Sequence, residues 1–259
     1  SDEISVRQYE AVKHALAAHE NINYAYRNKY LLTASLNLDG SSRVGDNAIN
    51  TIKIGQLPFG LFYSAGLAWR ISNESFMNQM SFIEDLKLRL SYGKTGNDDI
   101  GESSATDYYQ AIKFRETVGL FPALIANDEL SYETVSQVNV GLDLSLLANR
   151  FMFSVDYFTG NTSDMIIFNP IDAYYGFDFR IENGGEIQNK GLELTTFLRI
   201  VDASKFKFDV QAWFSQVTNE VTGIEGNKLV YDIPGGQKVN QEGYAPNSFY
   251  GYVFEGVYS

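Results

Sequence analysis

SQVNVGLDLSLLANRFMFSVDY, residues 136–157, contains two runs in which apolar and polar side chains alternate. The apolar members of the first run are Val138, Val140, Leu142, Leu144 and Leu146, and those of the second are Phe151, Phe153, Val155 and Tyr157. Successive side chains of a β-strand point to opposite faces, so each run predicts a strand with one apolar and one polar face. The short link 147–149 between the runs indicates a tight antiparallel turn.

The same alternation recurs along the chain, more weakly in places. Further runs cover residues 30–39, 63–71, 86–93, 192–200 and 205–214. The clear runs have roughly 8 to 13 residues, which suits a tilted bilayer-spanning strand of about 9 to 11 residues better than a soluble strand of about 5 or 6. We therefore expect about nine strands. Lipid-facing positions should include Leu142, Leu144, Phe153 and Val210, and lumen-facing positions Asn139, Asp143, Ser154 and Gln211.

Short and long connections take turns along the chain. Tight turns at 28–29, 147–149 and 202–204 alternate with long polar stretches at 40–58, 94–133, 161–187 and 218–247. The long stretches together carry −10 of the net charge of −12. This rhythm is typical of an all-β, antiparallel, up-and-down transmembrane β-barrel with short periplasmic turns and long extracellular loops. We expect residues 20–259 to form part of such a barrel.

The first 19 residues have a different pattern. Apolar and aromatic side chains recur there at helical spacing, at Val6, Tyr9, Val12 and Leu16, with His19 following on the same stripe. A recurrence of three or four residues is typical of an amphipathic helix. We therefore expect residues 1–19 to be a loop segment that contains a short helix.

Composition and motifs exclude several classes of function. The chain has no Cys, so it has no disulfide framework and no thiolate metal site or catalytic thiol. A net charge of −12 argues against nucleic-acid binding and against a polybasic membrane patch. Gly93-Lys94-Thr95 resembles the end of a phosphate-binding loop, but Leu88 stands where that motif needs glycine. His14 and His19 are five residues apart, off the spacing that directs two helical ligands to one metal.

The remaining acidic residues reveal no paired catalytic carboxylates by spacing, and strand carboxylates are explained by a polar lumen. We expect no enzyme, no cofactor and no metal. A soluble, sugar-binding β domain is the alternative that pattern alone leaves open, with loop aromatics as stacking platforms. The long, sustained apolar strand faces count against it.

Several stretches resemble the SusC/RagA family of TonB-linked outer-membrane proteins and occur in that family's order. They are the hairpin YRNKYLLTAS at 26–35 with DGSSR at 39–43, AWRISNE at 68–74, LKLR at 86–89 with SYGKTGN at 91–97, NVGLD at 139–143, SVDYF at 154–158, NKGLEL at 189–194 and FYGY at 249–252. The resemblance covers nearly everything from about residue 24 onward. It implies a barrel of about twenty-two strands with a plugged lumen, of which this sequence is an internal piece.

The resemblance also implies a function. Members import a glycan or peptide nutrient through the outer membrane of Gram-negative, Bacteroidota-type bacteria, among lipid and lipopolysaccharide. A SusD-like surface lipoprotein captures the nutrient, and TonB, which would contact a part of the protein outside this sequence, supplies the energy. The alternative is a SusC-like barrel that serves as a structural subunit of a larger outer-membrane assembly or secretion complex.

Candidate contact residues lie in the acidic loop 161–187. Phe168, Tyr174, Tyr175 and Phe177 are grouped there among carboxylates. Aromatic rings stack on sugar rings or peptide side chains, and carboxylates accept hydrogen bonds from hydroxyls and amines. These rings are predicted to contact a ligand or the lipoprotein lid; packing of the loops against the lid or against each other remains the alternative.

Overall fold

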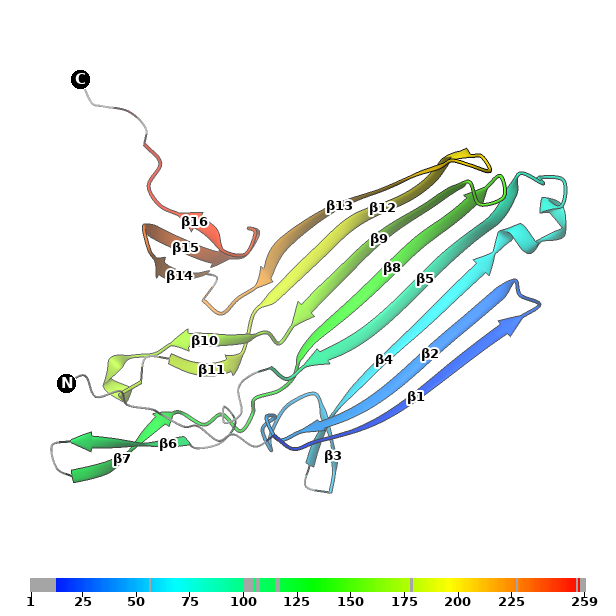
Figure 1. Ribbon diagram of the computed structural model, residues 1–259. Helices are drawn as coiled ribbons and strands as arrows, with labels where there is room; N and C mark the ends of the chain where they lie inside the picture. Colours follow the sequence, from blue (N-terminus) through cyan, green and yellow to red (C-terminus); the bar gives the residue numbers. More distant parts are fainter. Residues whose placement is uncertain are drawn as a thin grey trace.

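One large antiparallel β-sheet dominates the fold (Figure 1). The computed structural model describes residues 13–55, 57–99, 105, 108–114, 117–177, 179–226, 228–254 and 256. The eight long strands, in their order across the sheet, are β1 (Ala15–Tyr26), β2 (Tyr30–Ser41), β4 (Leu57–Arg70), β5 (Ile83–Asn97), β8 (Glu133–Leu146), β9 (Phe151–Ser163), β12 (Glu186–Asp202) and β13 (Lys207–Gly223). A short ninth strand, β3 (Thr51–Ile54), pairs with β4. The prediction of an antiparallel, up-and-down sheet of about nine strands is confirmed, and the sheet is an open, curved wall rather than a closed barrel.

The strand register confirms the two faces predicted from the alternation. Leu142 lies directly opposite Leu88 of β5 and Val155 of β9, and its neighbour Asp143 lies opposite Ser154. Directly opposed residues of paired strands share a face of the sheet. All eight positions assigned from the sequence therefore separate as expected, four onto the apolar face and four onto the polar face.

Connections of different length lie at opposite ends of the sheet (Figure 1). The short β1–β2, β8–β9 and β12–β13 turns share one end with the β4–β5 connection, which contains the 3-10 turns η1 (Ile71–Asn73) and η2 (Ser75–Met77). We call this end the turn end and the opposite end the loop end. The predicted alternation of short and long connections is confirmed as a separation in space.

The loop end is more ordered than the polar composition of the long connections suggested. The strands there run on to 12–17 residues, longer than the alternating runs. Three small sheets lie beyond them, formed by β6 (Tyr108–Phe114) and β7 (Thr117–Leu124), by β10 (Ile166–Pro170) and β11 (Phe179–Asn183), and by β14 (Lys228–Ile233), β15 (Gly236–Gln241) and β16 (Ser248–Tyr250). A third 3-10 turn, η3 (Ala173–Tyr175), connects β10 to β11. These small sheets were not predicted, because polar residues on both faces of their strands interrupt the alternation of apolar and polar side chains.

The helix predicted within residues 1–19 is wrong for its described part. Ala15–Tyr26 is strand β1, and its twelve residues all pair with β2. Leu16 and His19 therefore lie on opposite faces of a strand rather than on one stripe of a helix. Cross-strand hydrogen bonding to β2 decides the conformation, because the two described positions of that stripe, Leu16 and His19, do not by themselves distinguish a helix from a strand. Residues 1–12 lie outside the described part.

Most of the least exposed apolar side chains gather at the loop end, in the loops and on the adjoining ends of the strands. One cluster contains Val44, Ala48, Phe62 and Tyr132, and another contains Ala105, Leu130 and Ile181. The apolar face of the wall is open by contrast; Leu67 and Phe214 are 56% and 54% exposed. Among the described residues, no helix has the length and hydrophobicity needed to cross a membrane.

Candidate functional site

An ion-pair network crosses three strands on the polar face. The Arg89 guanidinium of β5 donates to Asp143 of β8, with its Nε and Nη2 at 2.9 and 2.8 Å from Oδ2 and Oδ1. The same guanidinium reaches Asp156 of β9 at 3.0 Å. Gly141 stands between these partners, and a Cβ there would lie 2.4–2.6 Å from Asp156 Oδ1 and the guanidinium atoms. Glycine is therefore needed for Arg89 to span β8.

Two further groups complete this network. Lys87 Nζ lies 2.8 Å from Asp143 Oδ2, and Ser154 Oγ donates to Asp143 Oδ1 at 2.8 Å. Bidentate and charge-assisted bonds of this kind fix side-chain geometry strongly. The arrangement holds the polar face in one shape, and each described carboxylate of it is engaged by a cation.

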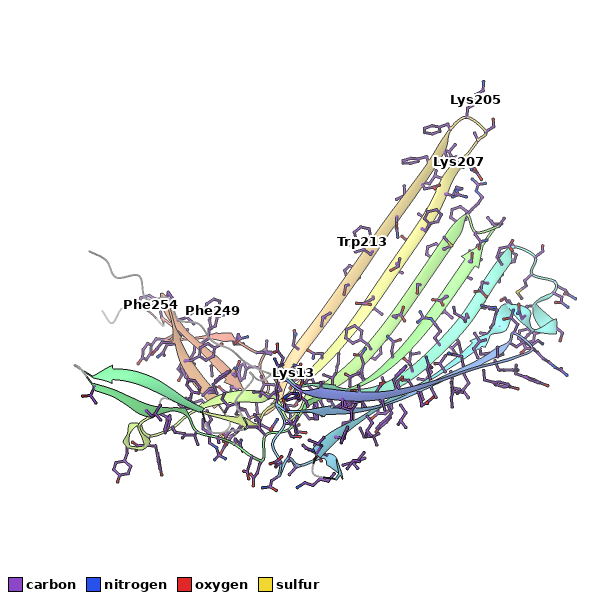
Figure 2. The ribbon with its side chains drawn as sticks, turned by 60° about the horizontal axis from the view of Figure 1, so that its bottom comes forward. Lys13, Lys205, Lys207, Trp213, Phe249 and Phe254 are labelled. Carbon is purple, nitrogen blue, oxygen red and sulfur yellow. The ribbon has the colours of Figure 1, made fainter. Side chains whose placement is uncertain are left out.

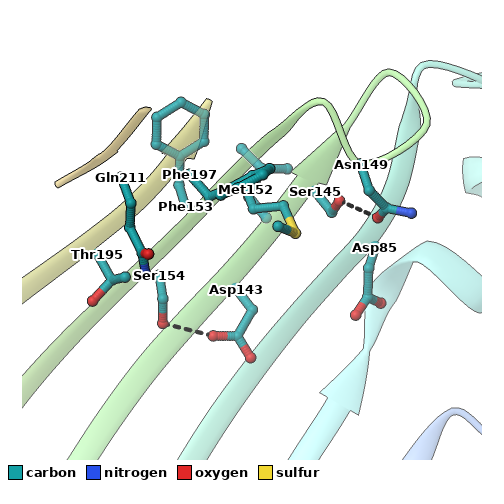
Figure 3. A pocket seen from close by; sticks show the side chains of 11 residues that line it. Asp85, Asp143, Ser145, Asn149, Met152, Phe153, Ser154, Thr195, Phe197 and Gln211 are labelled. Carbon is teal, nitrogen blue, oxygen red and sulfur yellow. Dashed lines mark hydrogen bonds between the residues drawn. The ribbon is translucent and has the colours of Figure 1, made fainter. Parts of the chain in front are cut away.

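A hollow of about 410 Å³ opens on the polar face beside this network, toward the turn end (Figure 3). Its lining includes Asp143 and Ser154 together with Asn149, Met152 and Phe197. Ser145 Oγ donates to Asn149 Oδ1 at 2.6 Å across its edge. The lining combines amides, three hydroxyls, two carboxylates and apolar groups, and none of its described residues is a histidine. The hollow therefore offers hydrogen-bonding groups and apolar surface side by side.

Three loops are locked together at the loop end. Leu130 and Ser131, which precede β8, are 0% and 1% exposed. The Asn183 side chain of β11 accepts from the Ser131 N–H at 2.7 Å and donates to the carbonyls of Ser131 and Asp164 at 3.0 and 2.8 Å. Ser131 Oγ donates to the Ile49 carbonyl at 2.7 Å. We call this set the loop junction; it joins segments 42–50, 125–132 and 164–185.

Close backbone approach makes the loop junction tight. Gly45 N–H donates to the Leu130 carbonyl at 2.8 Å, and a Cβ on Gly45 would lie 2.1 Å from the Asp128 carbonyl oxygen. Asn127 Nδ2 donates to the Ile181 carbonyl at 3.0 Å. Buried backbone groups are thus satisfied by side chains from other loops, which fixes the loops relative to one another.

The four predicted contact residues are brought onto one hairpin, β10–β11 with its connection. Phe168 packs edge-on against Phe179, with ring centroids 5.1 Å apart. Tyr174 and Tyr175 in η3 are 92% and 67% exposed and meet edge-to-face at 6.0 Å. Phe177 follows them and is half-buried. Because Phe168 packs against Phe179 and Phe177 is half-buried, the two tyrosines are the most accessible rings of the four. Their role in binding stays a prediction.

Sequence reasoning missed the loop junction and the partners of Arg89. The polar faces of β5, β8 and β9 were visible as alternation, so a lumen lined with Arg89, Asp143 and Asp156 could be expected. Their mutual contact depends on β5 pairing with β8 across 35 intervening residues. Asn183 gave no signal, because an asparagine in a polar loop is ordinary until its buried partner Ser131 is known. Groups of three or more histidine and acidic side chains able to hold a metal are absent from the described residues.

Comparison with known proteins agrees with this architecture. The sequence matches the family model described as TonB dependent receptor-like, beta-barrel over residues 2–252. TonB-dependent receptor P39 of Formosa agariphila is 35% identical over 251 residues, which cover 96% of this chain and 23% of that relative. TonB-dependent receptor SusC of Bacteroides thetaiotaomicron is 29% identical over 260 residues, which cover 92% of this chain and 24% of that relative.

The solved structure of the RagAB peptide transporter contains a similar sheet. It superposes with a TM-score of 0.80 at 29% identity, over 92% of this chain and 25% of that chain. The resemblance to SusC/RagA proteins is thereby confirmed. The chain spans about a quarter of the length of the relatives it matches. The two-faced antiparallel sheet, with its short turns at one end and long loops at the other, fits a segment of such a barrel. The chain belongs to the TonB-dependent receptor family and forms a part of that family's β-barrel.

Proposed function

We propose that this chain forms part of an outer-membrane barrel that imports a nutrient with energy supplied through TonB. The observation that carries the proposal is the two-faced sheet, with Leu142 and its neighbours on one face and the Arg89 network on the other. An apolar outer band and a polar, ion-lined interior are the features of a spanning barrel with a hydrated lumen. Relatives named as TonB-dependent receptors and a structure named as a peptide transporter support the proposal.

The proposed placement is the outer membrane of a Gram-negative bacterium of the Bacteroidota type, in contact with its lipid and lipopolysaccharide. Relatives from Formosa and Bacteroides support that placement. The apolar face meets lipid, the turn end lies in the periplasm and the loop end lies outside the cell. Every backbone group in the bilayer needs a partner, so the outer strands β1 and β13 would pair with further strands of the full barrel.

This orientation predicts the sidedness of single cysteines. In full-length protein that carries this segment, Asp99→Cys at the loop end should react with an impermeant maleimide on intact cells. Ala148→Cys in the β8–β9 turn should react only after the outer membrane is opened. Both sites are exposed and the natural segment has no cysteine, so background labelling from it is absent. Labelling of both sites on intact cells would contradict the proposed topology.

The proposed partners are a SusD-like surface lipoprotein at the loop end and TonB, which would bind a part of the protein outside this sequence. The proposed cargo is a peptide or glycan. Three features of the loop end support this. Loops 94–133, 161–187 and 218–247 carry net charges of −5, −4 and −2. The rings of Tyr174 and Tyr175 are exposed, and the loop junction ties the hairpin that carries them to two other loops. Carboxylates accept hydrogen bonds from hydroxyl and amino groups, and tyrosine hydroxyls both donate and accept them. The role requires no catalytic residue.

Removing the two exposed rings tests whether the β10–β11 connection contacts the cargo. The double variant Tyr174→Ala/Tyr175→Ala should lower uptake of the nutrient about fivefold, the effect of about 1 kcal/mol of lost aromatic contact. Uptake of labelled nutrient at subsaturating concentration is the measurement. Tyr244→Ala, which removes another exposed loop-end ring, is the matched control and should leave uptake unchanged.

The amount of lipoprotein that is recovered with the barrel distinguishes contact with the cargo from packing against the lipoprotein lid. Reduced uptake with full recovery indicates cargo contact, whereas reduced uptake with reduced recovery indicates packing against the lid. Normal uptake refutes a role for these rings. A structural subunit of an assembly or secretion complex, the alternative, would be indicated if loss of the full-length protein left uptake of nutrients intact.

A further inference from the structure

A row of aromatic rings crosses three strands at the turn end of the apolar face. Tyr26 stacks on Tyr30, with ring centroids 6.5 Å apart and planes at 23°. Tyr30 lies directly opposite Trp69 of β4 in the register, so all three rings share the apolar face. Tyrosine and tryptophan prefer the boundary between hydrocarbon and headgroups, because one end of each ring system is apolar and the other is polar.

One carboxylate binds the polar ends of two rings of this row, Tyr30 and Trp69. Glu74, which follows η1, accepts from Lys29 Nζ at 2.8 Å, Tyr30 Oη at 2.9 Å and Trp69 Nε1 at 3.1 Å. These hydrogen bonds, that from Lys29 first, lower the pKa of Glu74 to about 2. Glu74 is therefore ionised at neutral pH and balances the charge of Lys29. The rings are held in place, and the charge of this pair is neutralised.

Arg27, in the same turn as Lys29, does not take part in the ion pair between Lys29 and Glu74. Its guanidinium carbon lies 5.2 Å from the centroid of the Tyr26 ring, and the side chain is exposed. Within the described part of the chain it has no carboxylate partner. Its backbone φ of 51° belongs to the β1–β2 turn. The guanidinium thus sits on the outer edge of the aromatic row, where the apolar face ends.

Other turns at this end resemble the first. Arg150 of the β8–β9 turn bonds to the carbonyls of Arg199 and Ile200 at 3.4 and 3.2 Å, not to a carboxylate. Lys205 projects from the tip of the β12–β13 turn (Figure 2). Seven basic and five acidic residues lie in the connections at the turn end, which are segments 27–29, 70–85, 147–150 and 199–209. These segments are therefore net positive, whereas the whole chain has a net charge of −12. Exposed Phe76, Phe82 and Phe206 accompany them. The turn end is therefore basic and aromatic. The negative net charge of the whole chain does not reveal this local excess of basic residues.

We propose that Arg27 and the Tyr26–Tyr30–Trp69 row form a binding site for an anionic phospholipid of the leaflet at the turn end. The guanidinium binds the headgroup phosphate, because its planar donor fork matches phosphate oxygens. The acyl chain lies along the apolar face below the rings, over Leu32 and Leu67, which are 39% and 56% exposed. Charge complementarity selects an anionic over a zwitterionic lipid. The inference rests on the proposed membrane placement, which puts this face in lipid.

The test measures lipid retention by full-length protein that carries this segment. Purified protein in detergent is titrated with phosphatidylglycerol or phosphatidylcholine, and native mass spectrometry gives the apparent affinity for each. The natural protein should prefer phosphatidylglycerol. Arg27→Asn removes the charge while keeping a residue that tolerates positive φ, and it should weaken phosphatidylglycerol binding about fivefold, equivalent to about 1 kcal/mol per cation. Arg27→Lys should retain most of the affinity.

A cation on a ring at the other end of the sheet provides the control. Lys228 Nζ lies 5.2 Å from the Tyr250 ring centroid at the loop end, the same spacing as Arg27 on Tyr26. Lys228→Asn should leave phosphatidylglycerol binding unchanged. Equal affinity for the two lipids, no effect of Arg27→Asn, or an equal loss in Lys228→Asn would overturn the lipid site. Insertion of the protein into vesicles is measured alongside: a protein that inserts but fails these tests refutes only the lipid site, and one that never inserts refutes the membrane placement as well.

Discussion

Leu142→Arg in the full-length protein is expected to lower the free energy of unfolding in lipid by about 2 to 4 kcal/mol. Leu142 lies near the middle of β8, on the apolar face, opposite Leu88 and Val155. An arginine there would place a guanidinium among lipid chains with no polar partner on the neighbouring strands. The variant should therefore give far less folded barrel, measured as the heat-modifiable band after refolding into vesicles and as the urea midpoint.

Asn139→Arg is the matched control on the same strand. Asn139 lies opposite Ser91 and Phe158 on the polar face, where a guanidinium can remain hydrated. It should change the urea midpoint little, because substitutions on the lumen side of a barrel cost little stability. Equal yields of the two variants, or the reverse order, would show that the faces have been assigned the wrong way round.

Asn183→Ala is expected to lower the free energy of opening the loop junction by about 2 to 4 kcal/mol while leaving the barrel folded. The substitution removes three hydrogen bonds to backbone groups of Ser131 and Asp164, and Ser131 is buried. Each buried polar group left without a partner costs about 1 to 3 kcal/mol. Hydrogen exchange at the amides of Leu130 and Ser131 should therefore become about thirtyfold faster or more, since 1.4 kcal/mol is tenfold.

Asn169→Ala on the neighbouring strand β10 is the control for that release. Asn169 bonds to the side chains of Glu182 and Glu225, at 2.6 and 3.3 Å, and both carboxylates can turn to water. Exchange at Ser131 should stay within about twofold of the natural protein, as for a surface substitution. If Asn183→Ala leaves exchange unchanged, the loops are held by their apolar contacts alone.

The loop junction also limits how the predicted contact residues can be tested. A deletion within 167–183 would remove Phe168 and the two tyrosines, but it would remove buried Ile181 and the Asn183 ties as well. Loss of uptake after such a deletion would not separate binding from collapse of the loops. Substitution of Tyr174 and Tyr175, which are exposed and outside the junction, avoids this problem.

Periodicity along single strands determined much of this protein. Val138 to Leu146 and Phe151 to Tyr157 could be assigned to strands and faces because a side chain's face depends only on its own position in an extended chain. Turn positions such as 147–149 followed from the same runs, because a hairpin begins where alternation stops. The order of short and long connections then required an up-and-down sheet. These features are local, so the residues themselves specify them.

Tertiary structure alone decided the rest, since it depends on which distant segments meet. Leu16 and His19 fit a helix or a strand equally well until β2 supplies hydrogen-bond partners along Ala15–Tyr26. Arg89 meets Asp156 only because β5, β8 and β9 are neighbours and Gly141 leaves the space between them. Non-local pairing of this kind is set by burial and by backbone groups seeking partners across the whole sheet, a balance that no window of the sequence contains.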